Sequence, residues 1–235
     1  MSVRRLDLNQ PAAFAFTAAN LAWADATIAK YPPGKQASAV ILLLWRAQEQ
    51  EGWVSKPAIE AVAAKLGMSY IRVLEVATFY TMFQLSPVGT AAHLQVCGTT
   101  PCMLRGAGDL LDICKKRIAP HAHERTADGK LSWEEVECLG ACVNAPMVLV
   151  GSDTYEDLNP ASFNELIDDF ERGAPPEPGP QIERQFAAPE GRPATLTDQR
   201  LYDGSVVGAW RAAFDEREKA RAEKAAAAVA AAPKP

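Results

Sequence analysis

Cysteines are the residues of this sequence whose spacing points most directly to chemistry. Four of the five form two local pairs: Cys97 and Cys102 with four residues between them, and Cys138 and Cys142 with three. The pairs are separated by 35 residues, so the chain must fold back to bring the four thiolates together. Thiolates bind zinc and iron–sulfur clusters alike. The spacing alone therefore predicts a closed metal site and leaves zinc, a [2Fe–2S] cluster and buried, metal-free cysteines all open.

The residues around each pair suit thiolate ligands. Thr100 and Pro101 are typical of a helix N-cap and a first helical residue. They place Cys102 in the first helical turn, where the helix dipole is expected to stabilise a thiolate. Gly140 gives the second loop the backbone freedom to wrap around a cluster. The fifth cysteine, Cys114, falls on an apolar stripe at helical spacing and is expected in the hydrophobic core.

Three segments around these cysteines resemble a known family. They are HLQVCGTTPCMLRGA, VECLGACVNAPM and the upstream EVATFYTMF. They are similar to the thioredoxin-like [2Fe–2S] ferredoxin component of respiratory complex I, the NADH-quinone oxidoreductase, where it is often called the E-type or 24-kilodalton-type subunit. The resemblance covers residues 14–170 and includes both cysteine pairs at the family spacing. It implies that one [2Fe–2S] cluster is bound by Cys97, Cys102, Cys138 and Cys142.

The resemblance also implies a role. The chain is expected to be a non-catalytic electron-transfer subunit whose cluster lies next to the FMN of a partner, and the partner flavoprotein is expected to bind both FMN and NADH. Neighbouring peripheral-arm subunits are further expected partners. An equivalent subunit of an NAD-linked formate dehydrogenase or hydrogenase is an alternative function. An alternative of another class is a structural zinc module with four cysteine ligands and no redox role.

The elements expected around the cysteines form an α+β fold with three parts. Helical patterns predict an N-terminal helical domain over 1–86, with stops at Pro32 and Gly52 and later helices at 58–66 and 70–82. Together these segments make four helices. The resemblance implies that the part which follows is a thioredoxin-like α/β [2Fe–2S] domain.

The second part is expected over 87–173, where strand-like and helix-like patterns alternate. The segments AHLQVC and LSWEEVEC predict strands, with a helical pattern between them. The segment MVLVGSDTYEDL predicts a hairpin that turns at Gly151, before a helix capped by Asn159. The apolar face expected for that helix consists of Phe163, Leu166, Ile167 and Phe170.

The third part, 174–235, is expected to be a tail. Six prolines lie between Pro175 and Pro193, a density that predicts an extended tether with no room for a regular element. From Val206 the chain is rich in alanine with balanced charges, which predicts a solvated helix. The tail can therefore cover a surface but not build a core.

Composition limits the other function classes. A net charge of −5 argues against nucleic acid as a partner. The longest apolar run, at 37–45, is shorter than the ~20 residues of a membrane span, and no targeting segment is recognised at the N-terminus. The resemblance implies a location in the peripheral arm, on the cytoplasmic side of a bacterial inner membrane or the matrix side in a eukaryote.

Two further groups of residues have patterns that could indicate sites. A helix-turn-helix pattern at 58–79 offers only Arg72 as a nucleic-acid contact, so helix packing explains it better. His121 and His123 are expected to be solvated loop residues rather than metal ligands.

Within the four residues before Cys138 the chain has three carboxylates: Glu134, Glu135 and Glu137. Negative charge close to a cluster opposes its reduction. In a strand Glu134 lies on the same side as Cys138, so at least this carboxylate is expected to influence the potential.

Overall fold

The computed structural model describes residues 4–187, 198, 214–221 and 223. The described residues up to 187 belong to one compact unit, Met1–Ala188. In this unit the elements combine helices with one mixed sheet, which confirms the predicted α+β class. The boundaries predicted after residues 86 and 173 stay predictions.

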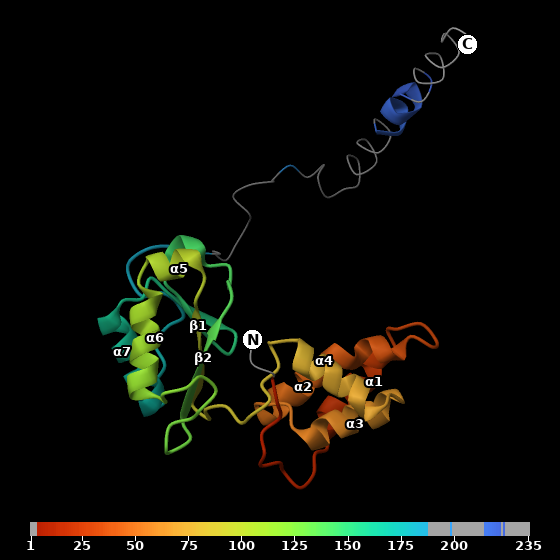
Figure 1. Cartoon of the computed structure of the whole chain (residues 1–235), viewed down its shortest axis with the longest axis horizontal. Coiled ribbons are helices and arrows are strands. Elements are labelled where there is room, and N and C mark those ends of the chain that lie inside the picture. The colour runs from red at the N-terminus through yellow and green to blue at the C-terminus, as the bar shows by residue number, and fades with distance from the viewer. Residues whose placement is uncertain (1–3, 188–197, 199–213, 222, 224–235) are drawn as a thin grey trace, which may run out of the picture. The chain divides into compact units, whose positions relative to one another are not determined.

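The N-terminal helices form one group around their own core (Figure 1). They are α1 (Ala18–Ile28), the short 3-10 helix η1 (Gln36–Ala39), α2 (Val40–Glu51), α3 (Lys56–Leu66) and α4 (Tyr70–Phe79). The helices α2 and α3 end at glycines with left-handed backbone, and the hydroxyl of Ser55 accepts a hydrogen bond at the start of α3. The core side chains are completely buried at Leu43, Leu44, Ile59, Val62, Val73 and Phe83.

The last of these helices ends earlier than the sequence predicts. We expected it to reach Met82, but α4 stops at Phe79 because Tyr80 takes an extended backbone. The guanidinium of Arg4 donates to carbonyls of this exposed end, including that of Tyr80 at 2.8 Å. A distant side chain thus satisfies backbone groups that would otherwise favour a further helical turn.

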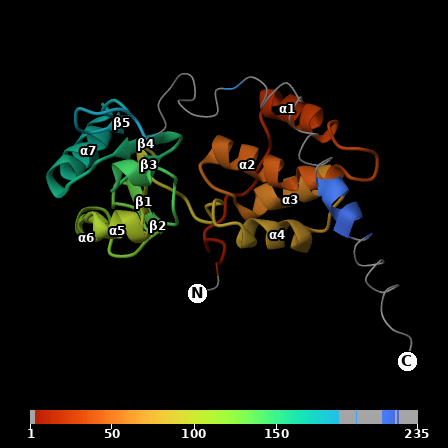
Figure 2. The same cartoon turned by 90° about the horizontal axis from the view of Figure 1, so that it is seen from above.

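The sheet has the strand order β2-β1-β3-β4-β5 (Figure 2). Its strands are β1 (Ala92–Cys97), β2 (Leu131–Val136), β3 (Val148–Val150), β4 (Asp153–Glu156) and β5 (Gly179–Pro180). The pairs β1–β2 and β4–β5 are parallel, whereas β1–β3 and β3–β4 are antiparallel. The predicted strands and the hairpin turn at Gly151 are present.

Three helices accompany the sheet. They are α5 (Thr100–Leu104), α6 (Ala107–Arg117) and α7 (Pro160–Arg172). The helical pattern predicted between β1 and β2 is interrupted at Gly106, whose φ of 104° is left-handed. Asn159 caps α7 as predicted, and the four predicted apolar residues of this helix are buried against the sheet.

The proline-rich segment is partly ordered, contrary to the prediction. Gly179 and Pro180 form a short strand beside Tyr155 and Glu156 of β4. A two-residue strand fits here because a sheet edge needs only a few backbone hydrogen bonds. Further along, 214–221 and 223 are helical and exposed, as expected for a solvated helix. Most of the predicted tail beyond residue 187 lies outside the described residues. Among the described residues no helix is long and apolar enough to cross a membrane.

Candidate metal centre

Both cysteine pairs follow the carboxyl ends of neighbouring parallel strands. Cys97 is the last residue of β1 and is paired in register with Val136, the last residue of β2. Cys138 therefore leaves β2 at the edge of the sheet where Cys97 leaves β1. Cys102 lies in α5, and Cys142 begins the 3-10 helix η2 (Cys142–Asn144). The fold thus brings two loops with two thiols each to one edge.

Thr99 and direct thiol contacts connect the four cysteines. The Sγ atom of Cys97 lies 3.3 Å from the Thr99 hydroxyl oxygen, and the sulfurs of Cys138 and Cys142 are 3.4 Å apart. The thiols of Cys97 and Cys102 shift each other's pKa, and Thr99 lowers the pKa of Cys138. In the part of the chain that is described, no three metal-binding side chains surround one common point.

The two pairs differ in exposure. The thiols of Cys97 and Cys102 are buried together with Ala141 and Met147, whereas Cys138 and Cys142 are exposed. A group held among these four sulfurs would have an apolar inner wall and an outer side that faces the surface.

Each thiol has its own electrostatic environment. Burial raises the pKa of Cys102 to about 12, and the neighbouring Cys97 thiol adds to this effect. Burial also opposes ionisation of Cys97, but hydrogen bonds from Thr99, Cys102 and Leu139 together outweigh it and lower the pKa of that thiol. The backbone N–H of Gly140 lowers the pKa of Cys138. Its partner, Cys142, has a raised pKa because of their shared hydrogen bond.

The N-cap predicted at Thr100 lies one residue earlier, and burial rather than the helix terminus governs the Cys102 thiol. The helix α5 has only five residues, its N-cap is Thr99 rather than Thr100, and that cap makes no side-chain hydrogen bond. Burial therefore dominates at Cys102. Since metal ligands must be thiolates, binding of a metal group here would release protons.

The glycine between the exposed cysteines adopts the required backbone. Gly140 has a φ of 91°, and a Cβ atom built on it would contact nothing within 4 Å. The loop thus needs glycine for its left-handed conformation rather than for space. In that conformation its N–H forms a hydrogen bond that stabilises the Cys138 thiolate.

Cys114 lies apart from the other cysteines, in the core between α6 and the sheet. It is completely buried, and burial raises the pKa of its thiol to about 12. The prediction of a core role is confirmed.

A buried carboxylate lies next to the candidate centre, and sequence reasoning did not foresee its surroundings. The Oε1 atom of Glu134 accepts hydrogen bonds from Gln84 and Gln95, each at 2.7 Å, and lies 3.1 Å from the Nε2 atom of His93. Burial opposes the charge, but the contacts with His93, Gln95 and His123 together outweigh it and lower the pKa of Glu134.

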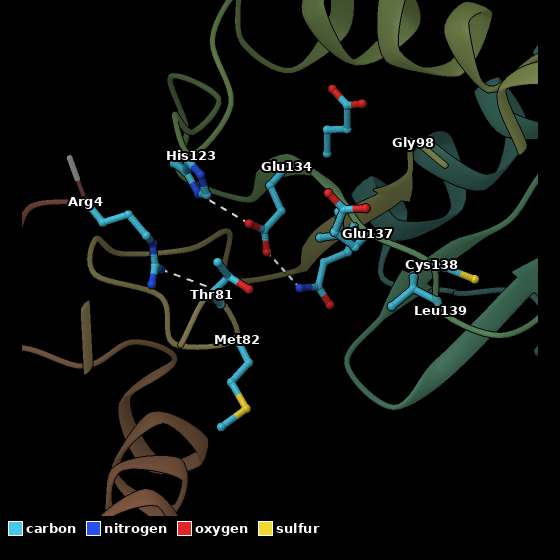
Figure 3. A pocket seen from close by; sticks show the side chains of 12 residues that line it. Arg4, Thr81, Met82, Gly98, His123, Glu134, Glu137, Cys138 and Leu139 are labelled. Atoms are coloured by element: carbon cyan, nitrogen blue, oxygen red, sulfur yellow. Dashed lines mark hydrogen bonds and ion pairs between the residues drawn. The ribbon is translucent and has the colours of Figure 1, made fainter. Parts of the chain in front are cut away.

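His123 is exposed in a loop, as expected, but it also contacts a buried carboxylate. Its Nδ1 atom lies 3.7 Å from the Oε2 atom of Glu134, and its ring points toward that carboxylate (Figure 3). Burial lowers the pKa of His123, although the Glu134 charge acts in the opposite direction. Both residues line a pocket of about 510 Å³ that has Arg4 at one end and Cys138 at the other. His121 is exposed, as expected.

Comparison with known proteins adds family information to this geometry. A family model described as thioredoxin-like [2Fe–2S] ferredoxin matches residues 24–171. One of the E-type subunits of the NADH-quinone oxidoreductase of Rhizobium meliloti is 66% identical over 200 residues, which cover 83% of this chain and 73% of that protein. The E-type subunit of the NADH-quinone oxidoreductase of Rickettsia typhi is 52% identical over 158 residues, 67% of this chain and 92% of that protein.

Among solved structures, the chain is similar in fold to an NAD+-reducing [NiFe]-hydrogenase in its air-oxidized state. The TM-score is 0.52 at 20% sequence identity, and the match covers 58% of this chain but only 23% of the hydrogenase chain. The likeness is therefore to one part of a longer polypeptide and concerns the fold.

Proposed function

Because the chain belongs to the thioredoxin-like [2Fe–2S] ferredoxin family, we propose that it is the electron-transfer subunit of an NADH:quinone oxidoreductase, with one cluster bound by Cys97, Cys102, Cys138 and Cys142. The relatives from Rhizobium and Rickettsia carry the name of such a subunit. The assignment of the four ligands rests on the cysteine pairs at the ends of β1 and β2. Their position is the observation that supports the proposal most strongly.

The donor set fits the cluster. A [2Fe–2S] cluster of the four-cysteine type needs two thiolates for each iron, and each loop of this site supplies two thiols. The sulfurs of Cys138 and Cys142 are in direct contact, and the buried thiols of Cys97 and Cys102 shift each other's pKa, so the site contains two close pairs. Gly140 adds a backbone N–H directed at sulfur. When bound, such a cluster accepts and donates one electron at a time.

The residues around the thiols would determine which side of the cluster is reached by water and by a partner protein. Ala141, Ala145 and Met147 bury Cys97 and Cys102 and keep water from that side. The side of Cys138 and Cys142 is exposed, so electron exchange with a partner is expected there. No side chain of this chain needs to serve as an acid or base.

Apolar side chains beside the site support a docking partner. Met103, Leu104 and Val143 are 44%, 82% and 67% exposed, and they follow Cys102 and Cys142 directly in the chain. Exposed apolar groups that lie together are typical of surfaces covered in a complex. The partner we propose is the FMN- and NADH-binding flavoprotein, on the cytoplasmic side of a bacterial inner membrane or the matrix side of a mitochondrial one.

A related enzyme is the second candidate. The fold similarity to the NAD+-reducing hydrogenase favours an equivalent subunit of such a complex. Purification of the native complex separates the candidates: quinone reduction by NADH supports the first, and hydrogen or formate oxidation supports the second.

The visible spectrum and metal content of the purified chain test the cluster itself. We expect a reddish-brown protein with two irons and two sulfides per chain. A colourless protein with one zinc per chain would replace this proposal with a structural zinc module.

A further inference from the structure

A short segment after the family domain packs against the candidate centre. Residues 179–187 lie beyond the stretch matched by the family model, which ends at residue 171. The segment begins as β5 beside β4, and the N–H of Gln181 donates to the carbonyl of Glu156 at 2.9 Å. At its far end Ala187 packs against the buried group that contains Cys97 and Cys102. We call residues 179–187 the strap.

The strap is tied to a buried carboxylate. Glu156 is only 2% exposed. Its Oε2 atom accepts a hydrogen bond from the Ala187 N–H at 2.9 Å. The same oxygen accepts from the Nδ2 atom of Asn144 at 2.6 Å, and Oε1 accepts from the Thr154 hydroxyl at 3.0 Å. Neutral donors thus surround this carboxylate, and the strap supplies one of them.

Asn144 connects the strap to the second cysteine loop. It is 1% exposed and is the last residue of η2, which begins at Cys142. Its side-chain amide donates to Glu156 and also to the carbonyl of Gln185 at 3.0 Å. Its backbone carbonyl accepts from the Asp157 N–H at 2.7 Å. The strap and the end of β4 therefore both form hydrogen bonds with Asn144. Asn144 lies two residues after Cys142 in the chain.

These contacts depend on one another. A buried carboxylate that loses a donor, or a buried amide that loses its acceptor, is destabilised by more than an ordinary hydrogen bond contributes. Removal of the Ala187 donor would admit water to Glu156 and weaken its hold on Asn144. The loop of Cys142 would then move more freely relative to β1 and α5, where the other thiol pair lies.

We propose that the strap positions the loop of Cys142 through Glu156 and Asn144, and thereby slows loss of the bound cluster. The residues concerned are positioning residues, since they act through Asn144 rather than on the cluster. The inference rests on the proposed role of Cys142 as a ligand. It assigns a task to a segment that lies outside the family domain.

The test compares point variants of the full-length, cluster-loaded chain. The central variant is Ala187→Pro, which removes the N–H donor to Glu156. Its matched control is Ala187→Ser, which is similar in size and keeps that donor. Glu156→Ala removes the acceptor, whereas Glu156→Gln keeps an amide oxygen for Asn144 and Ala187. The readout is the decay of visible absorption after addition of an iron chelator, with circular dichroism to follow folding.

We expect Ala187→Pro and Glu156→Ala to lose the cluster about three- to tenfold faster than the parent, the change that one or two lost hydrogen bonds allow. Ala187→Ser and Glu156→Gln should stay within about twofold of the parent because their hydrogen bonds are retained. The circular dichroism spectrum should be the same in all four variants. If Glu156→Ala fails to fold, Ala187→Pro decides, because Ala187 lies outside the helices and strands.

Two results would overturn the inference. One is decay of the folded Ala187→Pro variant at the parental rate. The other is equal acceleration in Ala187→Pro and Ala187→Ser, which would implicate the methyl contact and not the hydrogen bond. Failure of the ligand assignment looks different, because the parent itself would then contain no cluster or would keep it after Cys142→Ser.

Discussion

The sulfur atoms of Cys138 and Cys142 lie 3.4 Å apart on an exposed loop, while the other thiol pair of the site is buried. The N–H of Gly140 favours the thiolate of Cys138, and burial favours the neutral thiol of Cys102. One site therefore contains thiols with opposite pKa shifts. This asymmetry leads to a prediction about the metal-free protein.

In the cluster-free chain, Cys138 should react first with iodoacetamide at pH 7.5. The reactive form is the thiolate, and this thiol combines a lowered pKa with exposure. Cys102 and Cys114 should react last, since both are buried and have pKa values of about 12. Mass spectrometry of peptides at successive times gives the order. Modification of Cys102 as fast as Cys138 would contradict the assigned environments.

Exposed carboxylates beside the centre should lower its midpoint potential. Glu135 and Glu137 are exposed and line the pocket that contains Cys138. Replacement of either with glutamine should raise the midpoint potential by tens of millivolts, because it removes a negative charge that opposes the incoming electron. Screening by solvent and salt keeps the shift to this size. A redox titration followed by electron paramagnetic resonance measures the shift. Glu60→Gln on α3 is a control of equal charge, and no upward shift in either test variant would refute the prediction.

Stability should fall on acidification through His123 and Glu134. A lowered pKa in the folded state means that the unfolded chain binds protons more readily, so stability is lost as pH falls from the unfolded pKa through the folded one. For His123 this window begins near its ordinary pKa of about 6.5 and extends downward. For Glu134 it begins near about 4.3.

The melting temperature of the parent should therefore drop between pH 7.5 and pH 5.5, and His123→Gln should show a smaller drop. The partial exposure of the His123 side chain limits the size of the effect. Circular dichroism at the two pH values is sufficient. An equal drop in the variant and the parent would place the titrating group elsewhere.

Helix α7 should depend on its N-cap. The side chain of Asn159 accepts hydrogen bonds from the N–H groups of Ala161 and Ser162, and the hydroxyl of Ser162 accepts one from the N–H of Asn159. Asn159→Ala should destabilise the protein by about 1 kcal/mol, as a lost cap typically does. Urea denaturation measures the change, and Asn159→Ser, which retains a capping oxygen, is the control. A loss in Asn159→Ser as large as in Asn159→Ala would contradict a capping role.

The parts of the fold that follow local rules were predictable from the sequence. The Asn159 cap and the apolar face of α7 follow from residue type and helical spacing within a few residues. The core position of Cys114 follows from the same periodicity. The pairing of two cysteine loops required the resemblance to a family, because 35 residues separate them and spacing alone also allows zinc.

The unpredicted parts depend on contacts between distant segments. Glu134 is held by Gln84 and His93, which come from other segments, and no local pattern marks them as partners. The α4 helix ends early where Arg4 satisfies carbonyls more than seventy residues away. Proline density suggested no regular structure around Pro180, yet a backbone edge of β4 was available to pair with it.

The ligand assignment is tested most directly by the iron content and the electron paramagnetic resonance spectrum of five single variants. They are Cys97→Ser, Cys102→Ser, Cys138→Ser, Cys142→Ser and Cys114→Ala. Each of the four serine variants should lose the cluster or show a grossly altered spectrum, because serine replaces one of the thiolates that we assign as ligands. Cys114→Ala should keep two irons per chain and the parental spectrum. A parental cluster in any of the serine variants, or its loss from a folded Cys114→Ala protein, would contradict the assignment.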